Sequence, residues 1–302
     1  MKRNLKDIGR THRAIIHILF VAIYLCYIIP MMLIVSVSFS SEKSVTAQDA
    51  GYSLIPREFS VEAYKRVFAN PQSIIDGYIV TASQAFIGTL CSLVILGMTA
   101  YPLSRTNFAY KKPITFYIFF TMLFSGGLIP TFILTKSYGL YNNPLIMVIS
   151  GLVGIWNVMV ARSMIANSLP DELYEAAMMD GCSHFRYFFF FIIPLSQALM
   201  AIMCVRYAVG HWNDYMTALI YLNRQKYFPV QVVVRNLVAV LTYAASVTEM
   251  MHMDEDLAQE AMRLAQILKY CVIIVTSGPI IILYLFLQKY FVHGTTVGSL
   301  KG

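Results

Sequence analysis

A short polar segment interrupts a very apolar chain, and its residue types suit docking of another protein rather than bond-making chemistry. Residues Leu173–Pro194 read LYEAAMMDGCSHFRYFFFFIIP, in which acids, alanines and a glycine precede a run of aromatic side chains. Ala176 and Ala177 are small enough to let another surface approach the backbone closely. Glu175 and Asp180 remain available for polar contacts. The pattern favours a helix on which a partner docks.

Local signals set the limits of this helix. Ser168 followed by Asp171 resembles a capping box, and Pro170 suits a first turn. Asp171 and Glu172 favour the positive end of the helix dipole, and Gly181 can supply the left-handed residue that ends the helix. These signals predict a helix of about ten residues. A helix lying on lipid headgroups is the alternative, although such helices usually carry large apolar and lysine side chains; from composition alone, both interpretations stay open.

Motifs for catalysis are missing from the sequence. It contains no GxxxxGK[ST] phosphate loop, no nucleophile elbow and no zinc-binding helix motif, and His211 has no evident partners for a triad. The sequence therefore predicts a chain with no enzymatic activity of its own, no bound cofactor and no metal site.

The composition is that of an integral membrane protein. Hydrophobic residues make up 58% of the 302 residues and charged residues 13%, whereas soluble domains carry about 25% charged residues. The mean hydropathy is +0.62. We predict an all-α polytopic fold, one domain over residues 1–302, with about six transmembrane helices, because the apolar runs are long enough to cross a bilayer. The predicted spans are Ile15–Phe39, Ile79–Pro102, Ile114–Thr135, Pro144–Ile165, Phe188–Gly210 and Tyr270–Phe291.

The distribution of charge predicts the orientation. With the N-terminus inside, the inner segments hold twelve basic and five acidic residues, and the longer outer segments hold ten basic and eleven acidic residues. Basic residues concentrate on the cytoplasmic side of membrane proteins. We therefore place the N-terminus (1–14), the loop 166–187 and the tail 292–302 in the cytoplasm. The net charge of +7 then reflects topology, and we predict no nucleic-acid binding.

Two outer segments are long enough to hold structure. In the first, residues 40–77, a turn near Ser60 is predicted to precede a short amphipathic helix. In the second, residues 211–268, apolar residues at helical spacing predict a helix that leads directly into the last span. Asp254, Glu255 and Asp256 stand at the start of this helix. They are either first-turn acids favoured by the helix dipole or a cation site.

The polar segment resembles the EAA loop of permease subunits in ABC importers. A glycine stands six residues and a proline nineteen residues after the glutamate, as in that loop. Phe191 and Ile193 replace the Ile and Leu that usually precede the proline. The resemblance implies that the short helix seats in a cleft of a cytoplasmic ATPase subunit. The ATPase-coupling residues that it implies are Glu175, Ala176, Ala177, Asp180, Gly181 and Pro194.

Four further segments extend the resemblance along most of the chain. They are PLSR (102–105), FSGGLIPTF (124–132), VGHWNDY (209–215) and LQKYFVHGTTVGSLKG (287–302). They are similar to the carbohydrate-importer branch of these permeases, and most of all to complex-polysaccharide importers of the aldouronate type. In the smaller permease of the maltose importer a tail of this type reaches between the ATPase subunits, and the resemblance implies ATPase contacts for Gly298, Ser299, Leu300, Lys301 and Gly302.

The resemblance implies the rest of the assembly. It predicts alternating-access import of oligosaccharides, with acidic, uronate-containing sugars as one substrate class. The expected partners are a second homologous permease, two cytoplasmic ATPase subunits that bind ATP and Mg, and an extracytoplasmic sugar-binding protein. The expected location is the inner membrane of a bacterium, among its lipids, with both chain ends in the cytoplasm.

Residues of the sugar path are inferred from polar and aromatic groups that membrane burial disfavours. Charged residues inside spans usually face a cavity or a partner. For Arg206 the alternatives are a structural ion pair or snorkelling to the interface, and for Trp156 and Trp212 an interfacial aromatic anchor. The substrate-path residues predicted are Trp156, Asn157, Arg206, His211, Trp212, Asn213 and Asp214.

Two other classes of membrane protein compete with this interpretation. An ion-coupled secondary transporter or channel would be expected to carry buried acids for ion coupling, and the six predicted spans hold almost none. A receptor that signals through the polar helix would fit that loop but not the four carbohydrate-permease segments.

Overall fold

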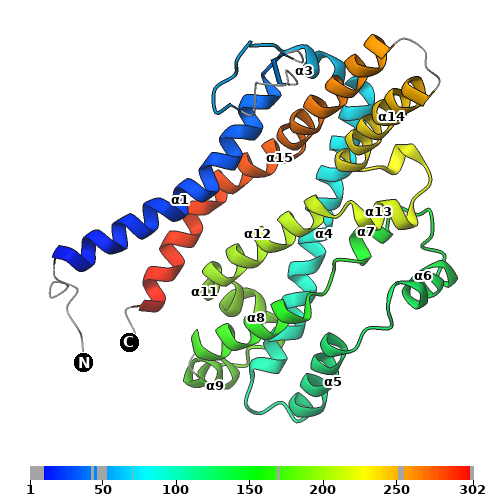
Figure 1. The fold of residues 1–302 in the computed structure, drawn as a ribbon. Helices are drawn as coiled ribbons and strands as arrows, with labels where there is room; N and C mark the ends of the chain where they lie inside the picture. The colour runs from blue at the N-terminus through cyan, green and yellow to red at the C-terminus, as the bar shows by residue number, and fades with distance from the viewer. Residues whose placement is uncertain are drawn as a thin grey trace. The chain divides into compact units, whose positions relative to one another are not determined.

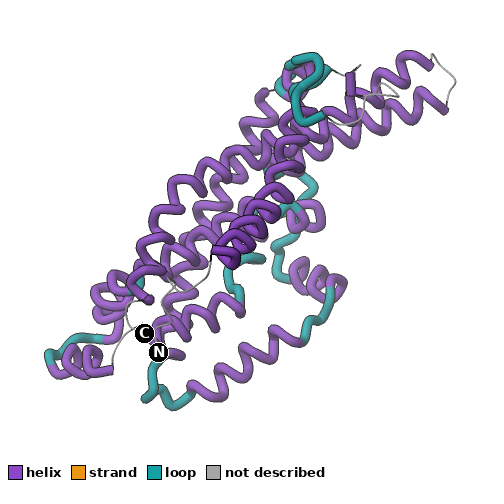
Figure 2. The backbone as a smooth tube through the Cα atoms, turned by 60° about the vertical axis from the view of Figure 1, so that its left-hand side comes forward, coloured by secondary structure: helices purple, strands orange, loops and turns teal. Residues whose placement is uncertain are grey.

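The structure is a computed structural model that describes residues 10–41, 44–45, 53–69, 71–168, 171–250 and 255–299. The described residues form helices joined by loops, with a single isolated bridge between Ser40 and Phe59 (Figure 2). The predicted all-α class is thereby confirmed. The chain divides into two compact units, Met1–Pro71 with Val234–Ser277 and Gln72–Val233 with Gly278–Gly302.

In the first unit, the end of a long apolar helix is fixed by a short one. Helix α1 (Arg10–Ser38) is followed after a loop by α3 (Glu62–Val67). The Tyr64 hydroxyl donates to Ser38 Oγ at 3.0 Å, which ties α3 to the end of α1. Ser60 Oγ accepts the Glu62 N–H at 3.2 Å. The turn and short helix predicted after Ser60 are therefore confirmed.

Helices α14 (Val230–Met250) and α15 (Glu255–Ser299) follow in the last part of the chain. Helix α15 is 45 residues long without a break, so the predicted outer helix does lead directly into the last predicted span (Figure 1). Glu255 and Asp256 are its first two residues, and Asp254 lies outside the described residues. Its buried side chains in the first unit recur at helical spacing: Leu264, Ala265, Ile267, Leu268, Cys271 and Val275.

The second unit is organised around α4 (Pro71–Ser104), drawn in cyan in Figure 1. Its 34 residues make a rod about 51 Å long at 1.5 Å per residue. Helices α8 (Ile155–Ser168), α9 (Asp171–Met179) and α12 (Gln197–Asn213) share a hydrophobic core with it. That core includes Leu96, Ala100, Leu103, Val158, Ala161, Ile165, Ala177, Tyr187, Leu199 and Met203.

Two predicted spans are each divided into two helices. Helices α5 (Lys111–Leu123) and α6 (Leu128–Ser137) meet at an angle of 116°. Gly127, with φ +85°, lies at that break, and this left-handed conformation suits glycine. The span predicted at Pro144–Ile165 consists of α7 (Ile146–Ile149) and α8, separated at Ser150–Gly154.

The span predicted at Phe188–Gly210 begins with an irregular helix. Helix α10 (His184–Tyr187) continues into a π-helical turn (η2, Phe188–Ile192) and α11 (Ile193–Leu195), and α12 then turns by 85°. Pro194 has no N–H to donate to the carbonyl four residues earlier. Prolines and π turns are both sites where helices bend sharply, and here they lie next to each other at the 85° turn.

A smaller core closes the other end of the second unit. Helix α7 contacts α13 (Met216–Tyr221), and the 3-10 turn η3 (Gln225–Tyr227) leads into α14. The buried residues there are Ile146, Met147, Ala218, Tyr221, Leu222 and Val232.

Length and hydropathy identify three membrane-crossing helices among the described residues, His12–Ser38, Pro71–Ser104 and Arg263–Leu285. The two bent pairs, Lys111–Leu123 with Leu128–Ser137 and His184–Leu195 with Gln197–Asn213, raise the number to five if each pair is one span. The sequence-based count of six also includes Pro144–Ile165, whose helix is interrupted at Gly151 and Gly154.

Candidate functional site

The helix predicted from the polar segment forms as α9, and it ends as predicted. Gly181 has φ +74°, the left-handed conformation that favours glycine. The Gly181 N–H donates to the Met178 carbonyl and the Cys182 N–H to the Ala177 carbonyl, each at 3.0 Å. These two bonds form a Schellman motif, which satisfies carbonyls that a helix end leaves unpaired. The capping role predicted for Ser168 stays a prediction, since residues 169–170 lie outside the described residues.

The two faces of α9 have different surroundings. Ala177 is buried and Leu173, Tyr174 and Met178 pack against the core of the second unit. The opposite face is exposed, and Met179 has 88% of its surface accessible. The sequence also predicts that Leu173, Ala176 and Ala177 share the docking face, which is wrong in part: Leu173 and Ala177 face the core and only Ala176 is exposed. We call this exposed face the outer stripe; it consists of Glu172, Glu175, Ala176 and Met179.

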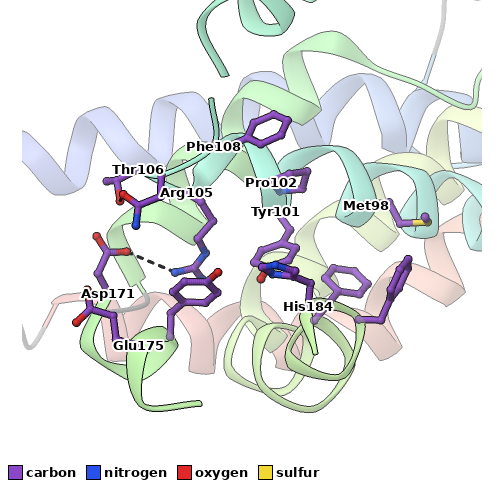
Figure 3. Close-up of a pocket in the computed structure, with 13 residues that line it drawn as sticks. Met98, Tyr101, Pro102, Arg105, Thr106, Phe108, Asp171, Glu175 and His184 are labelled. Atoms are coloured by element: carbon purple, nitrogen blue, oxygen red, sulfur yellow. Dashed lines mark hydrogen bonds and ion pairs between the residues drawn. The ribbon is translucent and has the colours of Figure 1, made fainter. Parts of the chain in front are cut away.

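Behind α9, a buried arginine joins three helices. Arg105 follows the last residue of α4, and only 9% of its surface is exposed. Its guanidinium carbon lies 5.3 Å from the ring centre of Tyr101, 4.9 Å from that of Tyr174 and 5.3 Å from that of Tyr187. Arg105 Nη1 also lies 3.5 Å from Asp171 Oδ1 (Figure 3). We call Arg105 and these three tyrosines the tyrosine cage.

The three tyrosine rings stabilise the buried guanidinium of Arg105, although few polar groups surround it. Aromatic ring faces attract cations, and arginine is commonly held in this way. Nε and Nη2 of Arg105 are buried and have no hydrogen-bond partner within the described part of the chain. The rings and one carboxylate therefore hold most of this cation. Lys111 Nζ donates to the Arg105 carbonyl at 3.1 Å, which fixes the backbone at the same point.

A pocket of about 520 Å³ opens beside the cage (Figure 3). Met98, Phe185 and Phe188 supply apolar walls, and Glu175 of the outer stripe lies at its edge with Asp171. The start of α9 and the end of α4 therefore line the same pocket.

The cage is not predictable from local sequence patterns. Arg105 belongs to the PLSR segment, and Asp171 is consistent with a first-turn acid. Tyr101, Tyr174 and Tyr187 do not stand out, because tyrosine is common in this chain, with 20 copies. An arginine directly after a long apolar run is the available signal, but Tyr174 and Tyr187 are 69 and 82 residues away from it in sequence.

A second buried polar group lies further along α4. The ring of His211 sits between Gly88 and Gly151: a Cβ added to these glycines would lie 2.7 Å and 2.6 Å from ring atoms. Ser92 Oγ is 3.3 Å from His211 Nε2, and Gln84 Nε2 donates to the His211 carbonyl at 2.7 Å. We call these five residues the His211 cluster. With 2% of its surface exposed, His211 is a packing group in this conformation.

The other residues predicted for the sugar path separate into buried and exposed ones. His211, Trp212, Asn213 and Asp214 lie together at the end of α12 and directly after it. The Trp212 carbonyl accepts a hydrogen bond from Gln231 Nε2, and Trp212 is buried. Asp214 accepts hydrogen bonds from Ser150 Oγ at 3.3 Å and the Thr217 N–H at 3.2 Å.

The remaining three lie on α8 and α12. Asn157 is buried, with 6% of its surface exposed, whereas Trp156 beside it is 59% exposed. Arg206 is exposed on α12, as is Asn213. Their contact with sugar stays a prediction.

Of the residues predicted to contact the ATPase, those of the loop are all described and those of the tail only in part. Pro194 is exposed in α11. In the tail, Gly298 and Ser299 are the last residues of α15, and Leu300, Lys301 and Gly302 lie outside the described residues.

Comparisons with known proteins agree on one family. Residues 93–297 match the family described as binding-protein-dependent transport system inner membrane component. The polygalacturonan/rhamnogalacturonan transport system permease protein YtcP of Bacillus subtilis is 33% identical over 275 residues, which cover 91% of this chain and 93% of that protein. Protein LplC of the same organism is 32% identical, over 91% of this chain and 90% of its own length.

A solved structure has the same fold along most of the chain. It is that of a bacterial ABC transporter involved in the import of the acidic polysaccharide alginate. The likeness covers 94% of this chain and 98% of that one, with a TM-score of 0.75 and 27% sequence identity. Together with the match over residues 93–297, these likenesses mean that the chain belongs to the binding-protein-dependent transport system inner membrane component family.

Proposed function

We propose that this chain is the permease subunit of an ATP-driven importer of oligosaccharides, and that the outer stripe of α9 seats on a cytoplasmic ATPase subunit. The single observation that carries the proposal is the division of α9 into a buried and an exposed face. Glu172, Glu175, Ala176 and Met179 face outward although the helix is otherwise packed on the core. Met179 supplies a flexible apolar contact, and the two glutamates supply charged ones.

Membership of this family supports a proposal for the rest of the assembly. Two ATPase subunits bind ATP and Mg, and this chain binds neither. A second, homologous permease completes the pathway, and an extracytoplasmic protein delivers the sugar. The excess of basic residues in the segments 1–14, 166–187 and 292–302 supports cytoplasmic chain ends and a cytoplasmic α9.

The substrate we propose is an acidic oligosaccharide. One similar permease is named for polygalacturonan and rhamnogalacturonan, and the solved importer carries alginate. Arg206 presents an exposed guanidinium on a largely apolar helix, and guanidinium groups bind carboxylates with two parallel hydrogen bonds. The exposed ring of Trp156 suits stacking on the C–H face of a sugar.

Transport proceeds by alternating access. Closure of the ATPase subunits around ATP moves the α9 helices seated on them, and rigid-body rotation of the attached spans exchanges the inward-open and outward-open states. This requires that α9 be held firmly by its own subunit, which the buried face of the helix and the Schellman motif both favour.

The proposal is tested by adding bulk to the outer stripe. Ala176→Trp places a large ring on an exposed position, so the isolated subunit should fold while seating of α9 is obstructed. In proteoliposomes with the full complex, ATP-driven uptake of a uronate tetramer should fall sharply. A neutral glucose tetramer serves as the comparison substrate.

The matched control is Ala166→Trp, the same change at an exposed alanine near the end of α8. It should leave uptake near the wild-type level. Undiminished uptake and undiminished copurification of the ATPase subunits in Ala176→Trp would reject α9 as the seat. Stronger uptake of the glucose tetramer than of the uronate tetramer would reject the acidic substrate alone.

A further inference from the structure

The tyrosine cage connects the helix proposed to receive force with the longest helix of the second unit. Arg105 stands immediately after α4, and the rings around it come from three elements: Tyr101 from α4, Tyr174 from α9 and Tyr187 from α10. Asp171, which pairs with Arg105, is the first residue of α9. One side chain thus contacts α4, α9 and α10 together.

The cage is built differently from an ordinary surface ion pair. Asp171 keeps 55% of its side-chain surface exposed, but the side chain of Arg105 keeps only 11%. Exposed ion pairs contribute little to stability, so the three rings rather than the carboxylate must provide most of the attraction that holds Arg105 to α9 and α10. Two of the guanidinium nitrogens, Nε and Nη2, are buried without a hydrogen-bond partner in the described residues, so among the described residues the ring faces are the main groups in contact with this cation.

Helix α9 has few other ways to pull on α4. It is nine residues long; Ala177 is its one buried side chain, and Leu173, Tyr174 and Met178 pack against the core while partly exposed. Apolar contacts resist compression but transmit tension weakly, because dispersion attraction falls quickly once atoms separate. The electrostatic attraction between a cation and three ring faces falls more slowly with distance.

We propose that Arg105 is a positioning residue that makes α9 and α4 move together during transport. This inference rests on the proposed function of α9, and it adds the residue through which motion leaves that helix. Arg105 contacts neither sugar nor ATP; it acts through Tyr174 and Asp171.

The test is the coupling ratio, defined as sugar molecules taken up per ATP hydrolysed by the reconstituted complex. In Arg105→Met the side chain keeps its apolar stem but loses the charge. The coupling ratio should fall by about tenfold, within the usual range for a coupling free energy. If Arg105 only stabilised the fold, uptake and ATP hydrolysis would fall together and the ratio would stay at the wild-type value, which would overturn the inference.

A matched control replaces another arginine that contacts the same end of α4. Arg162 Nε donates to the Leu103 carbonyl at 3.0 Å, so it also joins α4 to a neighbouring helix, but that helix is α8. Arg162→Met should keep the wild-type coupling ratio. An equal fall of the ratio in Arg162→Met would mean that any loosening of this end uncouples transport, and the special role of Arg105 would be rejected.

Arg105→Lys keeps the question answerable if Arg105→Met does not assemble. An ammonium group retains attraction to ring faces and to Asp171, so the coupling ratio of Arg105→Lys should lie between those of wild type and Arg105→Met. If the Met variant cannot be made, the coupling ratio of Arg105→Lys should still exceed that of Ala176→Trp. A coupling ratio of Arg105→Lys as low as that of Ala176→Trp would reject the cage. Failure of the proposed function looks different, because the wild-type complex itself would then show no ATP-driven uptake.

Discussion

Two regions of the second unit hold a basic side chain against α4, and they do so in opposite ways. In the tyrosine cage, ring faces surround Arg105 at 4.9–5.3 Å. In the His211 cluster, the imidazole lies so close to Gly88 and Gly151 that neither could carry a side chain without displacing it. The first region adjoins the exposed outer stripe of α9, and the second is sealed.

The difference separates a contact that can move from one that cannot. Cation–ring attraction tolerates small changes of position over the broad face of a ring, so the cage can stay closed while α4 and α9 move together. Close packing of a ring on two backbones is steep in distance, since interiors pack as densely as crystals. We therefore interpret the His211 cluster as a fixed point and the cage as the joint of the second unit.

The largest expected effect comes from forcing the fixed point apart. Gly88→Ala puts a methyl group within 3 Å of the imidazole, with ring atoms at 2.7–2.8 Å from its Cβ. The ring has little room to move away, because it also lies against Gly151, where a built Cβ would come within 2.6 Å of it. We expect a loss of about 3 kcal/mol in the free energy of unfolding, measured from the midpoint of unfolding in mixtures of SDS and mild detergent.

Gly210→Ala is the control for that change. Gly210 lies next to His211 in α12, yet a Cβ there would meet nothing within 4 Å. Alanine favours a helix over glycine by about 1 kcal/mol, so the control should be neutral or slightly stabilising. Equal stability of Gly88→Ala and wild type would show that the His211 ring is free to move, and the contrast with the cage would disappear.

A second prediction compares the same substitution, glycine to alanine, at two positions with nearly equal positive φ. Gly181 ends α9 with φ +74°, and Gly139 lies in a loop after α6 with φ +70°; a Cβ would meet nothing at either. Alanine at each should cost about 1–2 kcal/mol of stability. Only Gly181→Ala should reduce ATP-driven uptake several-fold, because it alone disturbs the end of α9. A matching loss of uptake in Gly139→Ala would show that global stability limits transport.

Sequence reasoning predicted the elements whose causes are local. The stop of α9 at Gly181 needs only one residue able to adopt positive φ, and the start of α3 needs only the Ser60 hydroxyl. The continuous path from Glu255 into the last predicted span follows from apolar spacing. In each case the physical cause lies within a few residues of its effect, so the sequence alone reveals it.

It did not predict features that need two distant segments. The interruption of Pro144–Ile165 occurs where Gly151 approaches the His211 ring, and hydropathy cannot register such an approach. The tyrosine cage depends on Tyr187 reaching the end of α4, and a single sequence carries no record of that contact.

The smallest expected effect tests whether polarity matters at the fixed point. Gln84 Nε2 donates to the His211 carbonyl at 2.7 Å, but Gln84 Oε1 is buried without a partner in the described residues. In Gln84→Met one hydrogen bond is lost and one unsatisfied acceptor is removed, and the Asp214 N–H still lies 3.5 Å from the same carbonyl. Because these changes oppose each other, we expect stability to change by no more than about 1 kcal/mol.

The same variant separates packing from sugar binding. If the cluster is only a fixed point, the KM for a uronate tetramer in Gln84→Met should equal that of wild type, while Arg105→Met alters the coupling ratio. A raised KM with unchanged stability would mean that this part of α4 and α12 contacts sugar in another conformation. His211, sealed here, would then open during the cycle, and the sealed cluster would be the moving region after all.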